Sequence, residues 1–194
     1  MEKDGRFRLK SAYNLVVEEE DNAPDRCWKD LWKWKGPNRI KHFMWIVLHG
    51  RLLTKKELTR RKITTNSHCN LCPDQEETID HILRNCSKAR VVWDKFQSRT
   101  VANSMSLPLQ DWLMINLRHH DTATEFGIII WQLWKQRNEE VMEGKVFSKN
   151  GLFARIQAWF NIVRNAQENV QLTSTSNPPA GQVRNVSWDP PLEG

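Results

Sequence analysis

The stretch CNLCPDQEETIDHILRNC, from residue 69 to residue 86, is the most specific pattern in this chain of 194 residues. It holds three of the four cysteines and one histidine, whereas the remaining cysteine, Cys27, stands far upstream. Cysteines clustered in this way favour metal ligation over a disulfide framework. The opening residues contain no apolar secretory signal, so we expect the thiols to stay reduced and available to a metal.

The ligand types and their spacing predict one structural zinc ion. Cys69 and Cys72 form a Cys-x-x-Cys turn that presents two thiolates together, and a helix predicted over 76–83 carries His81 inward, with Cys86 just past its end. Three thiolates and one imidazole make a closed tetrahedral shell, which suits zinc. Because the shell is closed, it leaves no position for water, and this argues for a structural ion and against a catalytic one.

Two alternatives to this ligand set stay open. His68 competes with His81 as the fourth ligand, although adjacent residues such as His68 and Cys69 rarely bind one ion together in such a turn. The second alternative is a reduced cluster without metal, beside a surface histidine. The other histidines have no cysteine or carboxylate companions at ligand spacing, and we assign no role to them: His42, His49, His119 and His120.

Basic residues accumulate directly before the cysteines. Segment 29–62 holds eleven lysines and arginines against two acids, a surplus of nine, while the whole chain has a net charge of +6. A local positive field of this kind attracts phosphates. The simpler interpretation is a solvated basic face that balances the acidic runs at 18–21 and 76–77. Its densest part is formed by five residues, and we predict nucleic-acid contacts at these and at Arg51: Lys55, Lys56, Arg60, Arg61 and Lys62.

Apolar periodicity predicts a mainly α fold. A short extended lead-in and a helix are expected over 6–16, a further helix is expected to start at Thr54, and the others are expected near 28–35, 38–50, 87–99, 108–117, 124–142 and 151–170. Thr54 and Glu57 have the spacing of a capping box, in which each side chain accepts from the backbone N–H of the other residue. Most of the ten tryptophans fall in apolar patterns, so we interpret them as packing residues.

Composition divides the chain into three expected regions: a small zinc-stabilised helical domain over 1–103, a helical connector over 104–172 and a flexible tail over 173–194. The tail holds four of the eight prolines and almost no apolar periodicity. The longest apolar stretch, near 126–134, is too short to cross a bilayer. We therefore expect an intracellular protein with no membrane partner, in the nucleus or the cytoplasm.

Several short motifs follow one another in a fixed order: DGRF at 4–7, SAY at 11–13, WKDLW at 28–32, IKHFMW at 40–45, HGRLLT at 49–54, the Cys69–Cys72 pair, Glu77-Thr78, His81, Cys86 and Val92-Trp93. Together they resemble the zinc-binding region on the C-terminal side of reverse transcriptases in plant non-LTR retroelements and their domesticated or degenerate relatives. The resemblance reaches to about Phe96. The segment VSWDPP at 186–191 also resembles the lead-in to a ribonuclease H domain.

The resemblance implies that Cys69, Cys72, His81 and Cys86 bind zinc, and that polymerase and ribonuclease H domains of a parent polyprotein are possible partners. The chain has no Tyr-x-Asp-Asp polymerase motif, and its ten aspartates are scattered singly. We therefore expect a non-catalytic module without a small-molecule substrate, which contributes binding to RNA or DNA. The alternative is a structural or protein-interaction module in which zinc only stabilises the fold.

Overall fold

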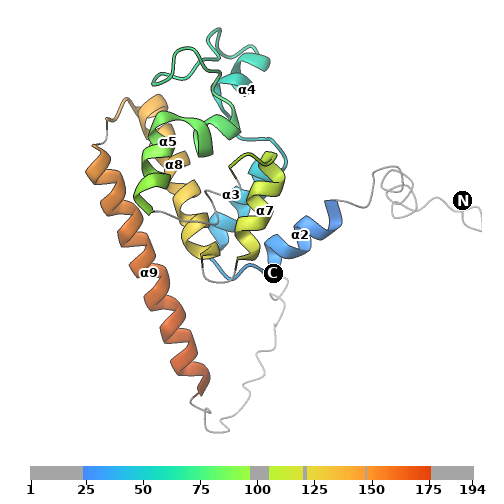
Figure 1. Cartoon of the computed structure of the whole chain (residues 1–194), viewed down its shortest axis with the longest axis vertical. Helices are drawn as coiled ribbons and strands as arrows, with labels where there is room; N and C mark the ends of the chain where they lie inside the picture. Colours follow the sequence, from blue (N-terminus) through green and yellow to red (C-terminus); the bar gives the residue numbers. More distant parts are fainter. Residues whose placement is uncertain (1–23, 97–104, 120–121, 147, 176–194) are drawn as a thin grey trace, which may run out of the picture.

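The computed structural model describes residues 24–96, 105–119, 122–146 and 148–175 (Figure 1). These residues are mainly helical, as the periodicity predicted, and they contain no strand beyond one isolated bridge between His68 and Glu76. The elements, in chain order, are α2 (Pro24–Lys33), α3 (Asn38–Leu48), α4 (Lys55–Arg60), the π-helical turn η1 (His81–Asn85), α5 (Ser87–Phe96), α7 (Leu109–Arg118), α8 (Ala123–Glu143) and α9 (Lys149–Thr175).

Helix α8 is the centre of the packing. It contacts α3, α7, α9 and η1, and α9 runs along one side of it (Figure 1). Five consecutive residues, 126–130, are buried, which is typical of a helix surrounded by neighbours on all sides. Gly127 allows one close approach, because a Cβ atom there would lie 2.8 Å from the indole of Trp34.

The predicted apolar stripes are confirmed in α3 and α9. Both helices turn these side chains into one shared core, and the buried members are Ile40, Phe43, Met44 and Val47 in α3 and Leu152, Ile156, Phe160 and Val163 in α9. The core contains residues from both sides of the boundary predicted near residue 103.

Most of the described tryptophans are packing residues, as expected, but two are not. Trp34, Trp93, Trp112 and Trp134 are buried, and Trp131 and Trp159 are half-buried. Trp32 and Trp45 are 47% and 40% exposed. The interpretation as packing residues is therefore wrong for Trp32 and Trp45. Because α2 ends at Lys33, the chain turns there and places Trp34 in the core instead.

Helices α3 and α4 end in the same way. Beyond α3, Gly50 has φ +64° and its N–H donates to Val47 O at 2.9 Å, while Arg51 N–H donates to Ile46 O at 3.0 Å. Beyond α4, Lys62 has φ +59°, and Lys62 and Ile63 donate to Thr59 O and Leu58 O, both at 2.9 Å. Both ends are Schellman motifs, which favour glycine at the left-handed position. Gly50 follows the preference and Lys62 does not.

Some predictions fall on other parts of the chain. The lead-in over 6–16 and residues 176–194 of the expected tail lie outside the described residues, and α9 continues to Thr175, so the helix extends three residues into the expected tail. Within the described residues, no helix is both long and apolar enough to cross a membrane.

Candidate metal centre

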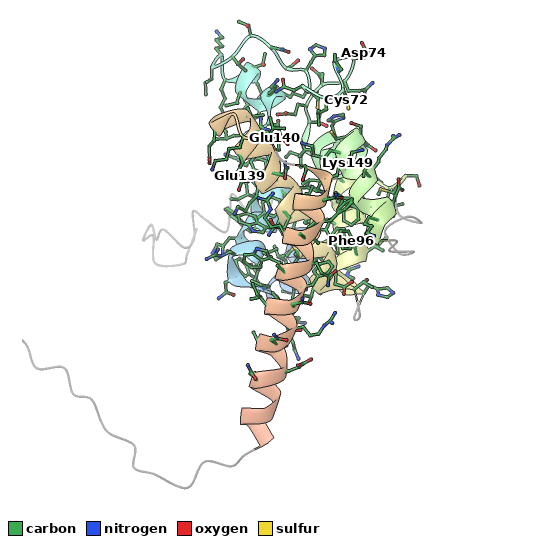
Figure 2. The ribbon with its side chains drawn as sticks, turned by 90° about the vertical axis from the view of Figure 1, so that its left-hand side faces the viewer. Cys72, Asp74, Phe96, Glu139, Glu140 and Lys149 are labelled. Atoms are coloured by element: carbon green, nitrogen blue, oxygen red, sulfur yellow. The ribbon has the colours of Figure 1, made fainter. Side chains whose placement is uncertain are left out.

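The structure brings the four predicted ligands together. Cys69, Cys72, His81 and Cys86 each offer one ligand atom, and these atoms all lie within 4.8 Å of one another. The group lies at one end of the molecule, where Figure 2 labels Cys72 and Asp74 beyond the end of α8. His68, the alternative fourth ligand, is exposed and is not part of the cluster.

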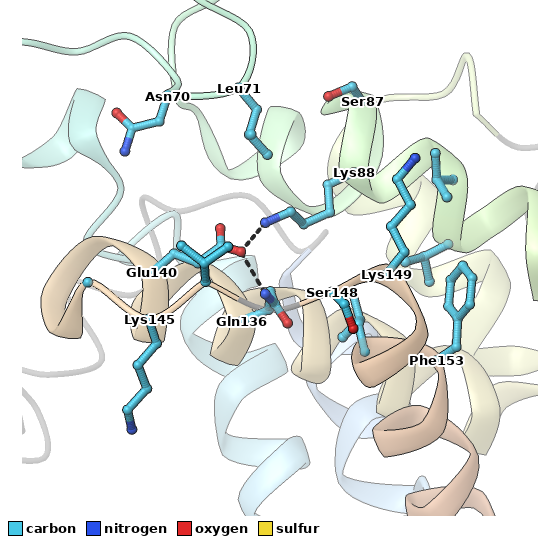
Figure 3. Close-up of a pocket in the computed structure, with 15 residues that line it drawn as sticks. Asn70, Leu71, Ser87, Lys88, Gln136, Glu140, Lys145, Ser148, Lys149 and Phe153 are labelled. Carbon is cyan, nitrogen blue, oxygen red and sulfur yellow. Dashed lines mark hydrogen bonds and ion pairs between the residues drawn. The ribbon is translucent and has the colours of Figure 1, made fainter.

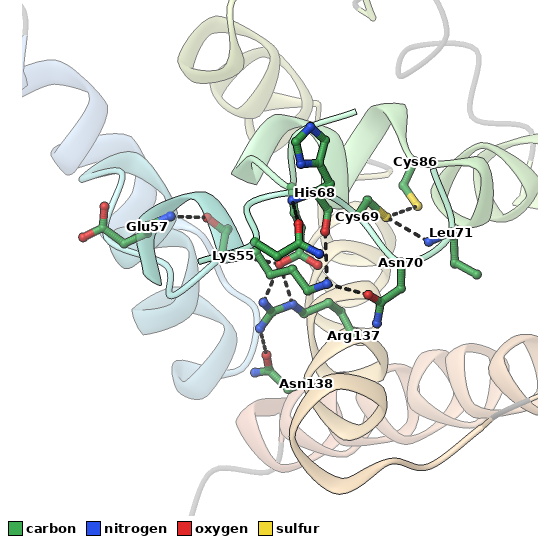
Figure 4. Close-up of polar contacts among 12 residues, drawn as sticks. Lys55, Glu57, His68, Cys69, Asn70, Leu71, Cys86, Arg137 and Asn138 are labelled. Atoms are coloured by element: carbon green, nitrogen blue, oxygen red, sulfur yellow. Dashed lines mark hydrogen bonds and ion pairs between the residues drawn. The ribbon is translucent and has the colours of Figure 1, made fainter. Parts of the chain in front are cut away.

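A short loop presents the first two cysteines. Cys69 N–H donates to Gln75 O, and Gln75 N–H donates to Cys72 O, both at 2.9 Å. The isolated bridge between His68 and Glu76 closes the base of the loop. Leu71 N–H also donates to Cys69 Sγ at 3.4 Å (Figure 4). Hydrogen bonds to a ligating sulfur stabilise its thiolate form.

The turn η1 presents His81 and Cys86. The helix predicted over 76–83 is only partly correct, because Glu76 lies in the bridge and the regular hydrogen bonding runs from His81 to Asn85. Cys86 N–H donates to His81 O at 2.6 Å, an i to i+5 bond. Five residues of an α-helix turn through about 500° and would place the two side chains roughly 140° apart. The wider π turn brings them closer, which suits a shared ion.

The cluster fits a tetrahedral zinc ion. Cys69 Sγ and Cys86 Sγ are 4.0 Å apart, and two sulfurs on one tetrahedral zinc are separated by about 3.8 Å at the usual Zn–S length. His81 Nε2 is buried and has no hydrogen-bond partner within the described residues. A buried nitrogen without a partner is costly, and a metal bond would satisfy it. The cluster is therefore consistent with one zinc ion.

Protonation at the cluster follows from its burial. Burial lowers the pKa of the His81 imidazole, which favours the neutral form that a metal needs. Burial raises the pKa of the Cys86 thiol to about 12. Burial also opposes ionisation of Cys72, but hydrogen bonds with Ser87, Cys86 and Cys69 together outweigh it and lower the pKa of this thiol.

A buried ion pair joins this region to α8, and the sequence analysis missed it. The side chains of Glu77 and Arg137 are only 3% and 8% exposed. Arg137 Nε donates to Glu77 Oε1 at 3.0 Å, and the backbone N–H of Lys55 donates to the same oxygen at 2.7 Å (Figure 4). The guanidinium also lies over the Trp134 ring, 5.2 Å from its centroid. The partners are 60 residues apart in the chain, so no local pattern could identify the pair.

The expected capping box is half formed. Thr54 Oγ1 accepts from Glu57 N–H at 3.3 Å, but Thr54 N–H donates to Leu52 O. The Glu57 carboxylate instead pairs with Arg60 and Arg61, at 2.7 Å and 2.6 Å. The hydrogen bonds from these two arginines lower the pKa of Glu57 to about 2.

The predicted nucleic-acid residues lie around α4, and their environments differ. Lys55 Nζ donates to His68 O at 3.0 Å and to the Asn70 side chain, so it is tied to the metal loop. Lys56 pairs with Glu76 at 2.6 Å. Arg51 and Lys62 are exposed, and neither forms an ion pair within the described residues. Helix α4 lies near the top of Figure 1 and α2 much lower, so the basic stretch 29–62 is divided between two parts of the molecule.

A pocket of about 450 Å³ lies beside the metal centre, between α5, the end of α8 and the start of α9 (Figure 3). Leu71 and Ser87 line its rim next to the cysteines. Its acidic group, Glu140, accepts hydrogen bonds from Lys88 and from Gln136, the second at 2.6 Å. These bonds hold the carboxylate in an ion pair between α5 and α8.

A mainly helical chain with a buried Cys₃His cluster defines a zinc-binding module. Residues 7–93 match the family described as zinc-binding in reverse transcriptase. The match covers the part of the chain from which the resemblance was drawn, and the resemblance is confirmed.

The chain also matches a curated plant protein. Over 157 residues it is 30% identical to the "Putative ribonuclease H protein" of Arabidopsis thaliana, an alignment that covers 76% of this chain and 24% of that protein. The chain thus spans about a quarter of the length of this relative. No solved structure matches it significantly.

Proposed function

We propose that this chain is a non-catalytic zinc-binding module of a retroelement reverse transcriptase, or of a protein derived from one, and that it binds the phosphate backbone of RNA or DNA. The observation that carries the proposal is the position of the basic helix α4 directly beside the Cys₃His cluster. Lys55 makes this connection, because its side chain bonds to the metal loop while its backbone bonds to Glu77.

In this proposal Cys69, Cys72, His81 and Cys86 hold one zinc ion, which supplies a fixed cross-link between the cysteine loop and η1. Small sites of this type couple metal binding to folding, because the unfolded chain holds no preformed ligand set. Four protein ligands complete the tetrahedron, so the ion has no open position at which to activate water. This supports a role in structure and favours a module without catalysis of its own.

The α4 surface, defined here as Arg51, Lys55, Lys56, Arg60, Arg61 and Lys62, is suited to phosphate contacts. The side chains of Lys56, Arg60 and Arg61 are 55%, 70% and 40% exposed, despite their ion pairs. Exposed ion pairs contribute little to the stability of the fold. These cations can therefore leave a carboxylate and bind a phosphate with little loss of stability. Exposed lysine and arginine contact the backbone before they contact base edges, and we expect weak sequence preference.

The experiment compares two variants that lose the same charge. In the first, Arg51, Arg60, Arg61 and Lys62 are changed to Gln, while Lys55 and Lys56 are kept because they bond to the metal loop and its closing bridge. In the control, Lys135, Lys145, Lys149 and Arg164, on and between α8 and α9, are changed to Gln. Fluorescence anisotropy with labelled single-stranded RNA and duplex DNA is recorded at several salt concentrations for the full zinc-loaded chain.

We expect the α4 variant to bind all sequences more weakly and to show a shallower salt dependence, by about 0.7 to 0.9 in slope for each phosphate that the protein no longer neutralises. The control variant should change much less, with equal zinc content in both. Equal losses of affinity in the two variants would show that affinity depends on net charge alone. This result would contradict a binding site at α4. No binding by the wild-type chain at low salt would remove the nucleic-acid proposal and favour the interaction module.

A further inference from the structure

Two tryptophans of the N-terminal helices lie on the surface in spite of their size. Trp32 on α2 is 47% exposed and Trp45 on α3 is 40% exposed. Six other tryptophans are buried or half-buried: Trp34, Trp93, Trp112, Trp131, Trp134 and Trp159. Exposed indoles on neighbouring elements require an explanation, because burial of a ring this large normally stabilises the fold.

Two histidines connect these tryptophans into one aromatic surface. The Trp32 ring meets the His42 ring edge to face, with 5.7 Å between centroids, and Trp45 lies against His49 at 4.3 Å. His42, Trp45 and His49 follow one another at spacings of three and four residues, so they occupy one face of α3. Each histidine is oriented by its own helix, since Nδ1 lies 2.9 Å from the carbonyl oxygen of the residue four positions earlier.

The charge around this surface is positive. Lys41 lies one helical turn before Trp45, and its Nζ donates to the backbone oxygen of Trp32 at 3.2 Å, so a cation lies beside the Trp32 backbone. An ammonium group has three donors, and this bond uses one of them. Lys33 and Lys35 are exposed on the adjoining segment. Asp30, an acid on α2, is paired with Arg118 of α7 at 2.7 Å, so its charge is compensated.

We propose that Trp32 and Trp45, with Lys41 beside the Trp32 backbone, form a stacking site for the unpaired bases of single-stranded nucleic acid. The inference rests on the proposed function and deepens it, because phosphate contacts at α4 do not distinguish a single strand from a duplex. Exposed aromatic rings beside lysines do distinguish them, since only an unpaired base presents its face to an indole. The site lies on α2 and α3, apart from the α4 surface (Figure 1).

The test uses the full zinc-loaded chain and two fluorescein-labelled probes, a 12-nucleotide single strand and the duplex of the same sequence. Base stacking on one aromatic residue contributes roughly 1 to 3 kcal/mol, so Trp32→Ala/Trp45→Ala should weaken single-strand binding by at least about tenfold. Duplex affinity should change less than twofold. Ile115→Ala/Ile162→Ala, which removes two exposed apolar side chains on α7 and α9, is the matched control and should change neither affinity.

Two further measurements keep the test valid if the alanine variant is poorly folded. Trp32→Phe/Trp45→Phe keeps an aromatic ring and should show an intermediate affinity for the single strand. Photocrosslinking of a bromouridine-substituted RNA strand to the wild-type chain, followed by mass spectrometry, should label peptides that contain Trp32 or Trp45.

The outcomes separate this inference from the proposed function. Unchanged single-strand affinity in both tryptophan variants, with labelling elsewhere, would overturn the stacking site while the α4 surface stands. Equal losses of affinity for single strand and duplex would also overturn it, because they would indicate a general docking surface. If the wild-type chain binds neither probe at low salt, the proposed function fails and the stacking site fails with it.

Discussion

Glu77 is the residue at which three segments meet. Its carboxylate accepts from Arg137 of α8 and from the first backbone N–H of α4, while its own N–H donates to Ser67 O at 2.8 Å. It therefore fixes the start of α4, the base of the cysteine loop and the C-terminal half of α8 relative to one another. The carboxylate is buried, so its bond with Arg137 lies where water does not compete.

Removal of this carboxylate charge should be severely destabilising. Glu77→Gln leaves the Arg137 guanidinium buried without a counter-charge, and breaking a buried pair in this way costs about 3 to 5 kcal/mol. Urea denaturation of the zinc-loaded protein measures the loss of stability. Glu143→Gln is the control, because it breaks the exposed pair with Lys145 and should cost less than about 1 kcal/mol. Similar losses of stability in the two variants would contradict this role of Glu77.

Zinc affinity should rise with pH. Burial holds the pKa of the Cys86 thiol near 12 in the metal-free fold, so zinc must displace its proton at neutral pH. Each proton released on binding raises the apparent affinity roughly tenfold per pH unit. Competition with a chromophoric chelator between pH 6 and 8 gives this slope, and a pH-independent affinity would contradict thiolate ligation.

The zinc stoichiometry is checked separately. Cys86→Ser removes one thiolate and should abolish tight binding, whereas Cys27→Ser, which changes the cysteine outside the cluster, should leave the zinc content at one equivalent. Elemental analysis of both variants distinguishes the two cases. Retention of a full equivalent by Cys86→Ser would contradict the ligand set.

The sequence predicted the cluster better than its surroundings. Cysteine and histidine spacing is local information, and it led to the four side chains that converge. The Glu77–Arg137 pair depends on how α8 packs against η1. The sequence around each of the two residues contains no pattern that predicts this packing. The two exposed tryptophans were missed for the same reason, since an apolar pattern does not show where a helix ends and which side chain then enters the core.

At the scale of single elements, the ends of α3 and α4 offer a matched pair of substitutions. Lys62→Gly should stabilise the protein by about 1 kcal/mol, because it relieves the left-handed backbone that a lysine adopts at a cost. Gly50→Ala should destabilise it by a similar amount, roughly 1 kcal/mol. A Cβ atom on Gly50 would meet nothing within 4 Å, so backbone conformation alone sets this cost. Thermal unfolding shows whether each substitution raises or lowers the stability of the protein. A loss of stability in Lys62→Gly would contradict the cost assigned to the left-handed lysine.

The helices themselves were largely predictable, and their ends were not. The apolar stripes of α3 and α9 repeat over several turns, so the helical spacing of apolar residues was enough to identify both helices. The helix expected over 76–83 begins later because Glu76 bonds across to His68, a contact between residues eight apart that competes with helix formation. The capping box failed in one half because Arg60 and Arg61 offer Glu57 charged donors, which are stronger than a backbone amide.

At the scale of the whole molecule, the shared core makes the two halves depend on each other. Ile40 and Phe43 on one side of residue 103 pack in the same core as Phe126 and Ile130 on the other. The boundary near residue 103 remains a prediction about the extent of the family region. We expect a fragment of residues 1–103, with zinc supplied, to lack a cooperative unfolding transition and fixed tertiary structure. Near-ultraviolet circular dichroism, with the full chain as reference, measures this, and a native-like fragment would show that the first part folds alone.

The 60-residue separation of Glu77 and Arg137 has a consequence for synthesis on the ribosome. At translation rates of roughly 5 to 20 residues per second, the arginine follows the glutamate by roughly 3 to 12 s. Once Cys86 has been added, the nascent chain holds every cysteine and histidine of the cluster, while the Glu77 carboxylate has no arginine to pair with. All four ligands are therefore available to a metal before the ion pair can form, and the emergence of α8 then supplies the arginine that anchors Glu77.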